Sequence, residues 1–471
     1  MITFNVLPDD VLLEIFDFCV DKDIDEDIDV YEELIIEWIT LAHVCRRWRS
    51  VVFQSPSRLN LQLLCTPKTP ARSIQDIWPP LPLIIHGYDN STSSADNIIT
   101  ALEHNDRVCQ ITLSYFSSVE SVTNSTAMQK PFPELTHLRM FNYETESIIP
   151  NSFLGGTAPR LRELRLCNVP FPGLPKLLLS STHLVELNLF DIPCSGYIPP
   201  EAMATSLTAL TRLEFLRIRF RHPLPRPALE SQRPPPPPLT RSILPSLTRI
   251  RFKGASEYLE DLLARVDAPH ISQMRVSFFN QIIFNTPELF QFISRRPALR
   301  APENGHIVFS SEAIIVAFPS QTSDYGVLSV RIKCTASEWQ LSSLEQVCTS
   351  SSPSFSRLQD LYIFEDRGHP PRWEGYVENT IWLDLLHPFS AVKNLYLCQK
   401  LVPRIAPALQ ELVGERKTEV LPTLENIFLK GFQPSGSLHE GIKNFVSARR
   451  LTNHPVAISR WEEDSKRQWM Y

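Results

Sequence analysis

Glycine is scarce in this sequence, whose 471 residues include 14 glycines against 40 prolines. Enzymes that cradle phosphates or expose a serine on a sharp turn need glycines at fixed spacings, because the backbone there approaches the ligand closely or adopts a positive φ. No G-x-x-x-x-G-K, G-x-G-x-x-G or G-x-S-x-G pattern occurs. We therefore expect no enzyme of these classes, no catalytic residues and no cofactor.

Paired metal-binding or disulfide-forming residues are also missing. The nine cysteines are scattered and include no C-x-x-C pair. The segment "HEGIK" begins like a zinc-binding helix, but Lys443 stands where the second histidine belongs. The twelve histidines are dispersed. We expect reduced thiols in the core of a cytoplasmic or nuclear protein, and no metal site.

The chain lacks both a strong charge bias and long apolar runs. Its net charge is -6 with a pI near 6.1, which gives no basic field for nucleic acid or an anionic membrane. No apolar run reaches 18 residues, and no basic-then-apolar signal segment opens the chain. With 43% hydrophobic residues, the chain has enough apolar material for a large core and is expected neither to span a membrane nor to be secreted.

Two amphipathic helix patterns occupy the first fifty residues. The first, "LPDDVLLEIFDFCV", has apolar residues on one stripe, with Pro8 suited to a first helical turn. The second runs from about Glu33 to Phe53 as a single predicted helix that ends before Pro56, since proline disfavours helical geometry in the residue ahead of it. One face of this helix carries Leu41, Val44, Cys45, Trp48 and Val51.

These residues carry a resemblance. "LPDDVLLEIF" followed by "LAHVCRRWRSVVF" resembles the F-box, a small three-helix module that docks onto the Skp-type adaptor of a cullin ubiquitin ligase. The resemblance implies an F-box over residues 1–56 and a set of adaptor-binding residues: Leu7, Pro8, Val11, Leu12, Ile15, Phe16, Leu41, Val44, Cys45, Trp48 and Val51. The alternative is that both stripes pack only within the chain, as a cap on a solenoid formed by the later residues.

An acidic segment, "DKDIDEDIDVYEE", lies between the two helix patterns at residues 21–33. Its acids fall nearly at the spacing of a calcium-binding loop, and Ile28 matches the usual apolar position. Glu26, however, occupies the place where the sharp turn calls for glycine, and no second loop of this kind exists. We interpret the segment as an acidic insert in the F-box; a calcium-responsive binding protein is the less favoured alternative.

Beyond Pro56 a short pattern repeats: an apolar residue, two others, an apolar residue, one other, an apolar residue. It occurs ten times, as "VCQITL", "LTHLRM", "LRELRL", "LVELNL", "LEFLRI", "LTRIRF", "ISQMRV", "LQDLYI", "VKNLYL" and "LENIFL". Its last two apolar positions lie two apart, as on one side of a strand, and helix-like stretches separate several copies. This resembles a divergent leucine-rich repeat, although Val169 and Ile192 stand where asparagine usually follows the strand, and the pattern fades between Gln281 and Thr335.

The predicted fold is thus a small all-α F-box module followed by an irregular α/β leucine-rich-repeat-like solenoid over residues 57–455. A proline-rich loop at 223–238 interrupts the solenoid, and 456–471 form a charged C-terminal tail. The residue between the last two apolar positions of each copy projects to the other side of the sheet. Arginine is frequent there in the middle copies and aromatic residues in the late ones, so the predicted target-binding residues are Arg139, Arg165, Arg217, Arg251, Arg275, Tyr362 and Tyr396.

Arginine forks suit carboxylate and phosphate oxygens, so an acidic or phosphorylated target segment is the hypothesis for this surface. The alternative is that Glu163 and Glu186, also outward, neutralise part of the row. An F-box followed by leucine-rich-like repeats is the arrangement of substrate receptors in Skp–cullin–F-box ligases, and the mixture looks like the expanded F-box families of mushroom-forming fungi. The resemblance implies adaptor and cullin partners with an unknown protein target; a repeat scaffold without a ligase role is the alternative.

Overall fold

The computed structural model describes residues 7–19, 39–56, 59, 61–68, 80–88, 95–114, 119–142, 148–223, 241–281, 283–300, 303–318, 328–334, 336–350, 357–373, 378–412, 419–430, 440–451 and 453–461. The acidic insert 21–33 and, apart from Pro223, the proline-rich loop 223–238 lie outside these residues. The chain divides into two compact units, Met1–Glu186 (unit 1) and Leu187–Tyr471 (unit 2).

Unit 1 begins with helix α1 (Asp9–Cys19), a short helical segment over residues 39–44, and helix α3 (Arg46–Gln54). The single second helix predicted from Glu33 to Phe53 is wrong, because the backbone is extended at Cys45 (φ -159°, ψ 169°). The Cys45 Sγ then accepts a hydrogen bond from the Trp48 N–H at 3.4 Å and caps α3. Cysteine is not among the usual N-cap residues, so the sequence carries no signal for this break.

The rest of unit 1 is a parallel sheet whose strands follow in chain order. The strands are β1 (Leu63–Cys65), β2 (Leu83–Tyr88), β3 (Val108–Ser114), β4 (His137–Phe141) and β5 (Glu163–Cys167). Between them lie short helices, namely α5 (Asp96–Leu102), α6 (Val119–Thr123), η3 (Ala127–Gln129) and η4 (Phe153–Gly156), and α7 (Leu174–Ser180) follows β5. The apolar positions of the repeat, such as Leu138 and Leu164, are fully buried.

An asparagine does follow the strand in two consecutive repeats, one residue earlier than the position occupied by Val169. Asn168 has a positive φ of 52°, is buried, and donates a hydrogen bond from Nδ2 to the Asn142 carbonyl at 2.9 Å. Asn142 in turn donates its backbone N–H to the Cys167 carbonyl at 3.0 Å. The side-chain amide of Asn168 therefore joins two consecutive repeats, at a position that the sequence pattern did not predict.

Unit 2 holds a longer sheet with the order β6-β7-β9-β11-β14-β13-β12-β15-β16-β17-β18. Its strands are β6 (Glu186–Ile192), β7 (Phe215–Phe220), β9 (Arg249–Gly254), β11 (Gln273–Phe278), β12 (Asn304–Phe309), β13 (Ala313–Phe318), β14 (Leu328–Lys333), β15 (Asp360–Glu365), β16 (Asn394–Leu397), β17 (Asn426–Lys430) and β18 (Ala457–Trp461). A separate pair consists of β8 (Ser242–Ile243) and β10 (Val266–Asp267). All ten copies of the repeat pattern run into strands.

The faded region between Gln281 and Thr335 breaks the repeat in a specific way. Strand β13 runs antiparallel to both β12 and β14, and the three enter the sheet in reverse of their chain order. The repeat then resumes at β15, which pairs parallel with β12. The pattern fades because β12 and β13 are each followed by another strand, and helix α12 returns only after β14.

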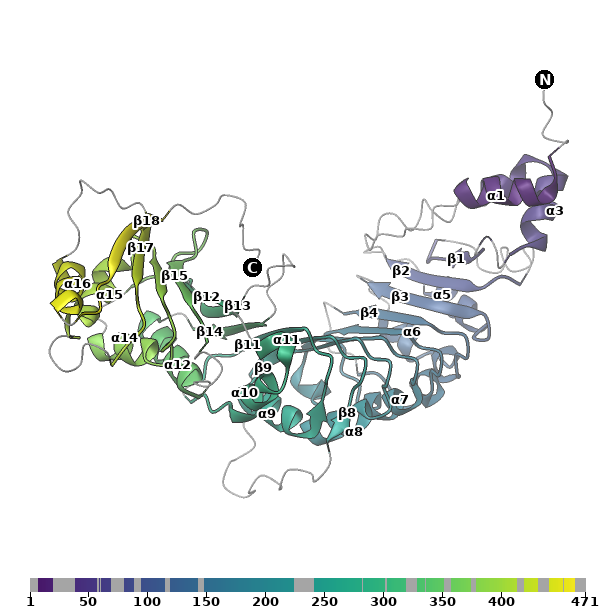
Figure 1. The fold of residues 1–471 in the computed structure, drawn as a ribbon. Coiled ribbons are helices and arrows are strands. Elements are labelled where there is room, and N and C mark those ends of the chain that lie inside the picture. Colours follow the sequence, from purple (N-terminus) through teal and green to yellow (C-terminus); the bar gives the residue numbers. More distant parts are fainter. Residues whose placement is uncertain are drawn as a thin grey trace, which may run out of the picture. The chain divides into compact units, whose positions relative to one another are not determined.

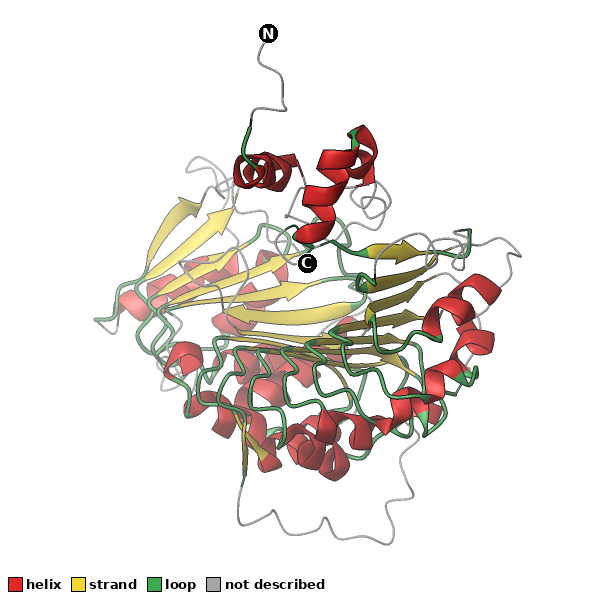
Figure 2. Cartoon of the chain, turned by 90° about the vertical axis from the view of Figure 1, so that its right-hand side faces the viewer, coloured by secondary structure: helices red, strands yellow, loops and turns green. Residues whose placement is uncertain are grey.

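In each unit the helices of the repeat region line one face of the sheet, and within the described part of that region no helix lies on the opposite face, here called the open face (Figures 1 and 2). In unit 2 the helical elements are η5 (Cys194–Gly196), α8 (Pro200–Leu207), α9 (Ser256–Arg265), α10 (Pro287–Ser294), α11 (Pro297–Arg300), α12 (Ser337–Ser350), α14 (Asn379–Leu386), α15 (Val402–Gln410) and α16 (Glu440–Leu451). Leu207 and Leu262 from this layer line the same small core cavity as Leu216 and Ile250. Leu216, Ile218, Ile250 and Phe252 are buried, and because side chains alternate along a strand, the side chains of residues 217 and 251 point to the open face.

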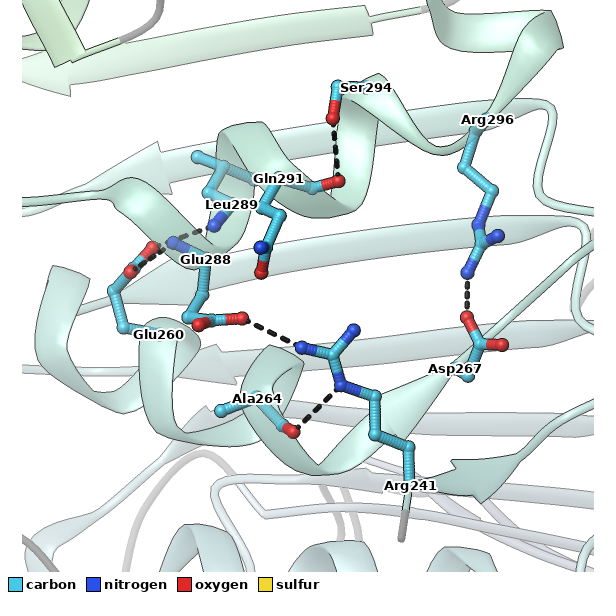
Figure 3. Close-up of polar contacts among 9 residues, drawn as sticks. All are labelled: Arg241, Glu260, Ala264, Asp267, Glu288, Leu289, Gln291, Ser294 and Arg296. Carbon is cyan, nitrogen blue, oxygen red and sulfur yellow. Dashed lines mark hydrogen bonds and ion pairs between the residues drawn. The ribbon is translucent and has the colours of Figure 1, made fainter. Parts of the chain in front are cut away.

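A polar joint connects helices α9 and α10 within the helical layer (Figure 3). The Glu260 carboxylate accepts the N–H groups of Glu288 at 2.7 Å and Leu289 at 2.9 Å, and so caps the start of α10. Arg241 joins Glu288 at 3.0 Å and donates to the Ala264 carbonyl at 3.1 Å. This joint fixes α10 against α9 through groups that helix ends otherwise leave without partners.

The sheet continues into the predicted C-terminal tail. Strand β18 pairs parallel with β17, so residues 457–461 belong to the repeat region and the boundary predicted at 455 lies too early. With that change, the predicted fold class, an all-α module followed by an irregular α/β solenoid, is confirmed. No helix among the described residues is long and apolar enough to span a bilayer.

Candidate interaction surfaces

The predicted row of outward arginines exists, and its members are in register within each unit. In unit 1 Arg139 stands opposite Arg165, and in unit 2 Arg251 stands between Arg217 and Arg275. Neighbouring members are thus one strand spacing apart, roughly 4.8 Å. The two parts of the row differ in charge.

In unit 1 carboxylates neutralise the row. Glu163 accepts from Arg139 at 2.5 and 2.9 Å and lies 2.6 Å from the Arg165 Nε, while Glu186 lies 3.1 Å from the Arg165 Nη2. All four side chains are largely shielded from solvent. The alternative interpretation of the sequence holds for Arg139 and Arg165, which act as an ion-pair network across β4 and β5 and not as a basic surface.

In unit 2 the row sits in a wider basic surface on the open faces of β7, β9, β11 and β14. The side chain of Phe215 lies beneath three guanidinium groups, whose central carbons are 5.5 Å (Arg217), 5.0 Å (Arg249) and 5.4 Å (Arg251) from its ring centroid. Arg249 stands opposite Phe215 in the register and was not among the predicted target-binding residues. Arg249 could have been predicted, because it lies two residues before Arg251 in the same strand and so points to the same face.

The predicted aromatic positions form a stacked column. The rings of His306, Tyr362, Tyr396 and Phe428 lie on successive strands with centroids 4.6, 4.1 and 4.5 Å apart. Trp461 packs edge-on against Tyr362 at 5.7 Å and Tyr396 at 5.6 Å. The ring faces of Tyr362 and Tyr396 are therefore engaged within the protein and are not available to stack on a target.

An amide and carboxylate row runs beside this column. Asn394 donates to Asp360 at 2.6 Å, and Asn426 donates to Asn394 at 2.8 Å. The open faces of β15, β16 and β17 are thus held by internal contacts. The remaining members of the predicted target-binding set, Arg217, Arg251 and Arg275, lie on β7, β9 and β11, which are not strands of the aromatic column.

The N-terminal helices form a second surface, built around a small core. Leu12 and Phe16 of α1 and Val52 of α3 are fully buried, and the Phe16 and Trp48 rings pack at 4.7 Å. Arg47 locks the start of α1 by pairing with Asp9 at 2.7 Å and donating to the Leu7 carbonyl. Arg49 donates to the Ala42 carbonyl at 2.9 Å and ties α3 to the segment before it.

The comparison with family models decides what these helices are. A family described as F-box-like matches residues 4–57. Residues 4–57 are an F-box-like domain. Among solved structures, the leucine-rich repeat-containing protein LegL7 from Legionella pneumophila is 12% identical over 83% of this chain and 98% of that chain, with a TM-score of 0.26. No curated protein is similar to the chain.

The eleven predicted adaptor-binding residues divide into core and surface of the F-box-like domain. Leu12, Phe16 and Val51 are buried and hold the helices together. Leu7, Ile15, Leu41 and Trp48 are half-buried, and Pro8, Val11, Val44 and Cys45 are exposed. A partner that leaves the helices packed meets only the half-buried and exposed residues.

Phe18, the most exposed apolar side chain among the described residues of the F-box-like domain, was not predicted. It is 90% exposed and follows Val11 (38% exposed) and Ile15 at the i, i+4, i+7 spacing of one helix face. We call Val11, Ile15 and Phe18 the α1 stripe. Val44, 59% exposed, adds a further exposed apolar side chain to the domain. The sequence shows that the apolar residues of α1 cover two faces of the helix, but it does not show which of the two faces the core uses.

Within the described residues, the cysteines and the groups that can bind metals add no candidate site. The eight cysteines that the structure describes in full are free thiols; Cys45 and Cys194 are exposed, so these two are not the core thiols that were predicted. Burial raises the pKa of the Cys65 and Cys109 thiols to about 11. In the described ranges no three His, Cys, Asp or Glu side chains are grouped as metal ligands.

Proposed function

We propose that the protein is a substrate-recognition subunit of a Skp–cullin–F-box ubiquitin ligase. The F-box-like domain docks onto a Skp-type adaptor, and through it a cullin, while the open face of unit 2 binds a target protein. The observation that carries the proposal is the α1 stripe. Exposed apolar side chains grouped on one helix face are the usual core of a protein interface.

The apolar residues of this small domain divide into a buried set that forms its core and an exposed set that remains uncovered. Leu12, Phe16 and Val52 satisfy the internal packing, so the α1 stripe is not needed to hold the three helices together. A side chain such as Phe18 contributes about 1.5–3 kcal/mol of transfer free energy when a partner covers it. F-box-like and leucine-rich-repeat folds generally serve as interaction modules, and we assign this chain recognition and no bond chemistry.

The test is a pull-down of a purified Skp-type adaptor with the full chain. The variant Val11→Asp/Phe18→Asp places charge on the α1 stripe without touching the core, and we expect it to lower adaptor retention more than tenfold. The matched control is Leu179→Asp, an exposed apolar residue of α7 outside the F-box-like domain. Circular dichroism checks that both variants remain folded.

Equal retention of the adaptor by both variants would remove the α1 stripe as the docking surface. If the wild-type chain retains no adaptor at all, the ligase role fails and the repeat scaffold becomes the better description. Leu12→Asp is not a suitable test, because Leu12 is fully buried and its replacement unfolds the domain whatever the domain binds.

A further inference from the structure

The open face of unit 2 concentrates positive charge over four adjacent strands. The outward positions of β7, β9, β11 and β14 hold two, three, one and two basic residues respectively, and no acidic residue. These basic residues, here called the basic face, are Arg217, Arg219, Arg249, Arg251, Lys253, Arg275, Arg331 and Lys333. From the end of β6, Asp191 contributes one carboxylate, 3.2 Å from Arg219. This concentration stands out in a protein of net charge -6.

Phe215 organises the centre of the basic face. Three guanidinium groups lie within 5.5 Å of its ring centroid, inside the range in which a cation is attracted by the ring quadrupole. The ring is only 8% exposed, so the arginine side chains lie over it. The attraction of all three guanidinium groups to the Phe215 ring holds these like charges close together and positions their N–H donors.

The charges of the basic face also act on one another. The pKa of Lys253 is lowered, first by burial and then by the positive charges of Arg219, Lys333 and Arg331, which outweigh the opposing effect of Asp191. Bringing these cations together therefore costs free energy in the protein alone. A bound anion relieves that cost.

The contrast with unit 1 shows that this arrangement is not a general property of the repeats. There the equivalent outward arginines, Arg139 and Arg165, share Glu163 between them. Between β7 and β9 the outward residues that stand opposite one another are Phe215 and Arg249, Arg217 and Arg251, and Arg219 and Lys253. The sheet thus gives one unit an internal ion-pair network and the other a basic face.

We propose that Arg217, Arg249 and Arg251 bind the phosphate group of a phosphoserine or phosphothreonine in a target segment. A phosphate monoester offers three acceptor oxygens and a charge near -2, which matches three planar donors better than a single carboxylate does. The neighbouring pair Arg219 and Lys253 lies two residues further along the same strands, roughly 7 Å away. An extended segment running along the strands places its alternate side chains at this spacing, so we expect an acidic residue two positions from the phosphorylated one.

This proposal rests on the proposed function only in naming the segment as part of a target; the binding itself needs no adaptor. The experiment presents the immobilised full chain with a degenerate phosphoserine peptide library and with the same library unphosphorylated. We expect at least tenfold greater retention of the phosphorylated library, and enrichment of Asp or Glu two positions from the phosphoserine.

The variant Arg217→Gln/Arg249→Gln/Arg251→Gln is expected to abolish that preference. Its matched control is Arg162→Gln/Arg212→Gln/Arg450→Gln, which makes the same change in charge at exposed arginines away from the basic face. Phe215→Leu keeps an apolar side chain beneath the arginines but removes the aromatic ring, and we expect it to reduce phosphopeptide retention severalfold with all three arginines present.

Equal retention of both libraries, or equal loss in the control variant, would overturn the proposal. Tighter binding of a glutamate-rich library would assign the surface to carboxylates, and tighter binding of a single-stranded RNA oligonucleotide would assign it to nucleic acid; both outcomes contradict the phosphate site. The failure of this site is separable from that of the ligase role, because the Arg217/Arg249/Arg251 variant is expected to retain the Skp-type adaptor normally.

Discussion

At the scale of the residue, Glu260 shows how burial and hydrogen bonding compete at one carboxyl group. Its carboxylate caps α10 by accepting the N–H groups of Glu288 and Leu289, which favours the charged form. Burial opposes this effect and is the larger, with the nearby Glu288 and Asp261 adding to it, so the pKa of Glu260 rises to about 7 from an ordinary value of 4.5. The cap therefore titrates near neutral pH.

The raised pKa of Glu260 determines how the stability of the protein depends on pH. Because the folded state holds the proton at a pH where the unfolded chain has released it, stability is highest below about pH 4.5 and falls as the pH rises to about 7. We expect Glu260→Gln, which carries no charge, to lose this dependence. The contribution is of the order of 1–3 kcal/mol, toward the lower end because part of the side chain stays solvated.

The measurement is urea denaturation of both proteins between pH 5 and 8, monitored by a signal from unit 2. The difference in free energy of unfolding between variant and wild type is expected to grow as the pH rises to 7 and then to level off. A difference independent of pH would show that Glu260 is charged throughout.

Residue-scale features were also the hardest to predict from sequence. Phe215 belongs to a repeat copy, but nothing in "LEFLRI" shows that its ring lies under arginines from two strands. Arg249 comes from a copy 34 residues later and meets Phe215 only through the strand register. Phe18 looked like one apolar residue among several, because a sequence pattern does not tell which face of α1 the core uses.

At the scale of the element, the contact between α15 and α16 depends on a glycine. Gly441 lies in the first turn of α16 and is buried, and a Cβ added there would come within 2.7 Å of the Ala406 carbonyl oxygen and 3.0 Å of its carbonyl carbon. Both atoms belong to the backbone of α15, which cannot move aside as a flexible side chain does. The two helices can approach this closely only without a side chain at position 441.

We expect Gly441→Ala to destabilise unit 2 by about 1–2 kcal/mol, since overpacking costs about 1–3 kcal/mol and the better helix propensity of alanine recovers up to about 1 kcal/mol. Thermal denaturation measures the effect. The control is Gly368→Ala, where an added Cβ meets nothing closer than 3.8 Å, and which we expect to be neutral within about 0.5 kcal/mol. A stable Gly441→Ala protein would mean that α16 shifts to accommodate the methyl group.

Strands and their register were largely predictable, and the exceptions have physical causes. The repeat pattern located β3 to β7, β9, β11 and β15 to β17, because burying one side of a strand against helices forces apolar residues at alternate positions. It missed β13, where residues on both sides of the strand are mostly buried and no alternation remains. The break at Cys45 was missed because a thiol cap leaves no familiar mark in the sequence.

At the scale of the whole molecule, the chain's last described strand closes the sheet of unit 2. Strand β18 covers the edge of β17, and Trp461 packs against Tyr396 two strands away and Tyr362 three strands away. Without it, β17 would present unpaired backbone groups beside an exposed aromatic column. Uncapped repeat ends of this kind are prone to fray and to pair with other chains.

Two truncations test this role. A chain ending at Val456 and one ending at Trp461 differ only in β18, so their difference isolates that strand. We expect the shorter chain to unfold at a temperature several degrees lower and to aggregate on heating at micromolar concentration. A thermal ramp monitored by light scattering compares the temperature of unfolding and the extent of aggregation of the two chains. Identical melting and scattering would show that β17 is stable without β18 at its edge.

Because β12, β13 and β14 enter the sheet in reverse order, the sheet cannot form strand by strand in chain order throughout unit 2. Strand β11 pairs with β14, which begins at Leu328, so the sheet cannot grow past β11 until the chain has been synthesised through β14. On either side of this point each new repeat can add to its predecessor by a short closure, whereas here about fifty residues must close at once. Growth along the solenoid is thus continuous up to β11, pauses there, and resumes at β15.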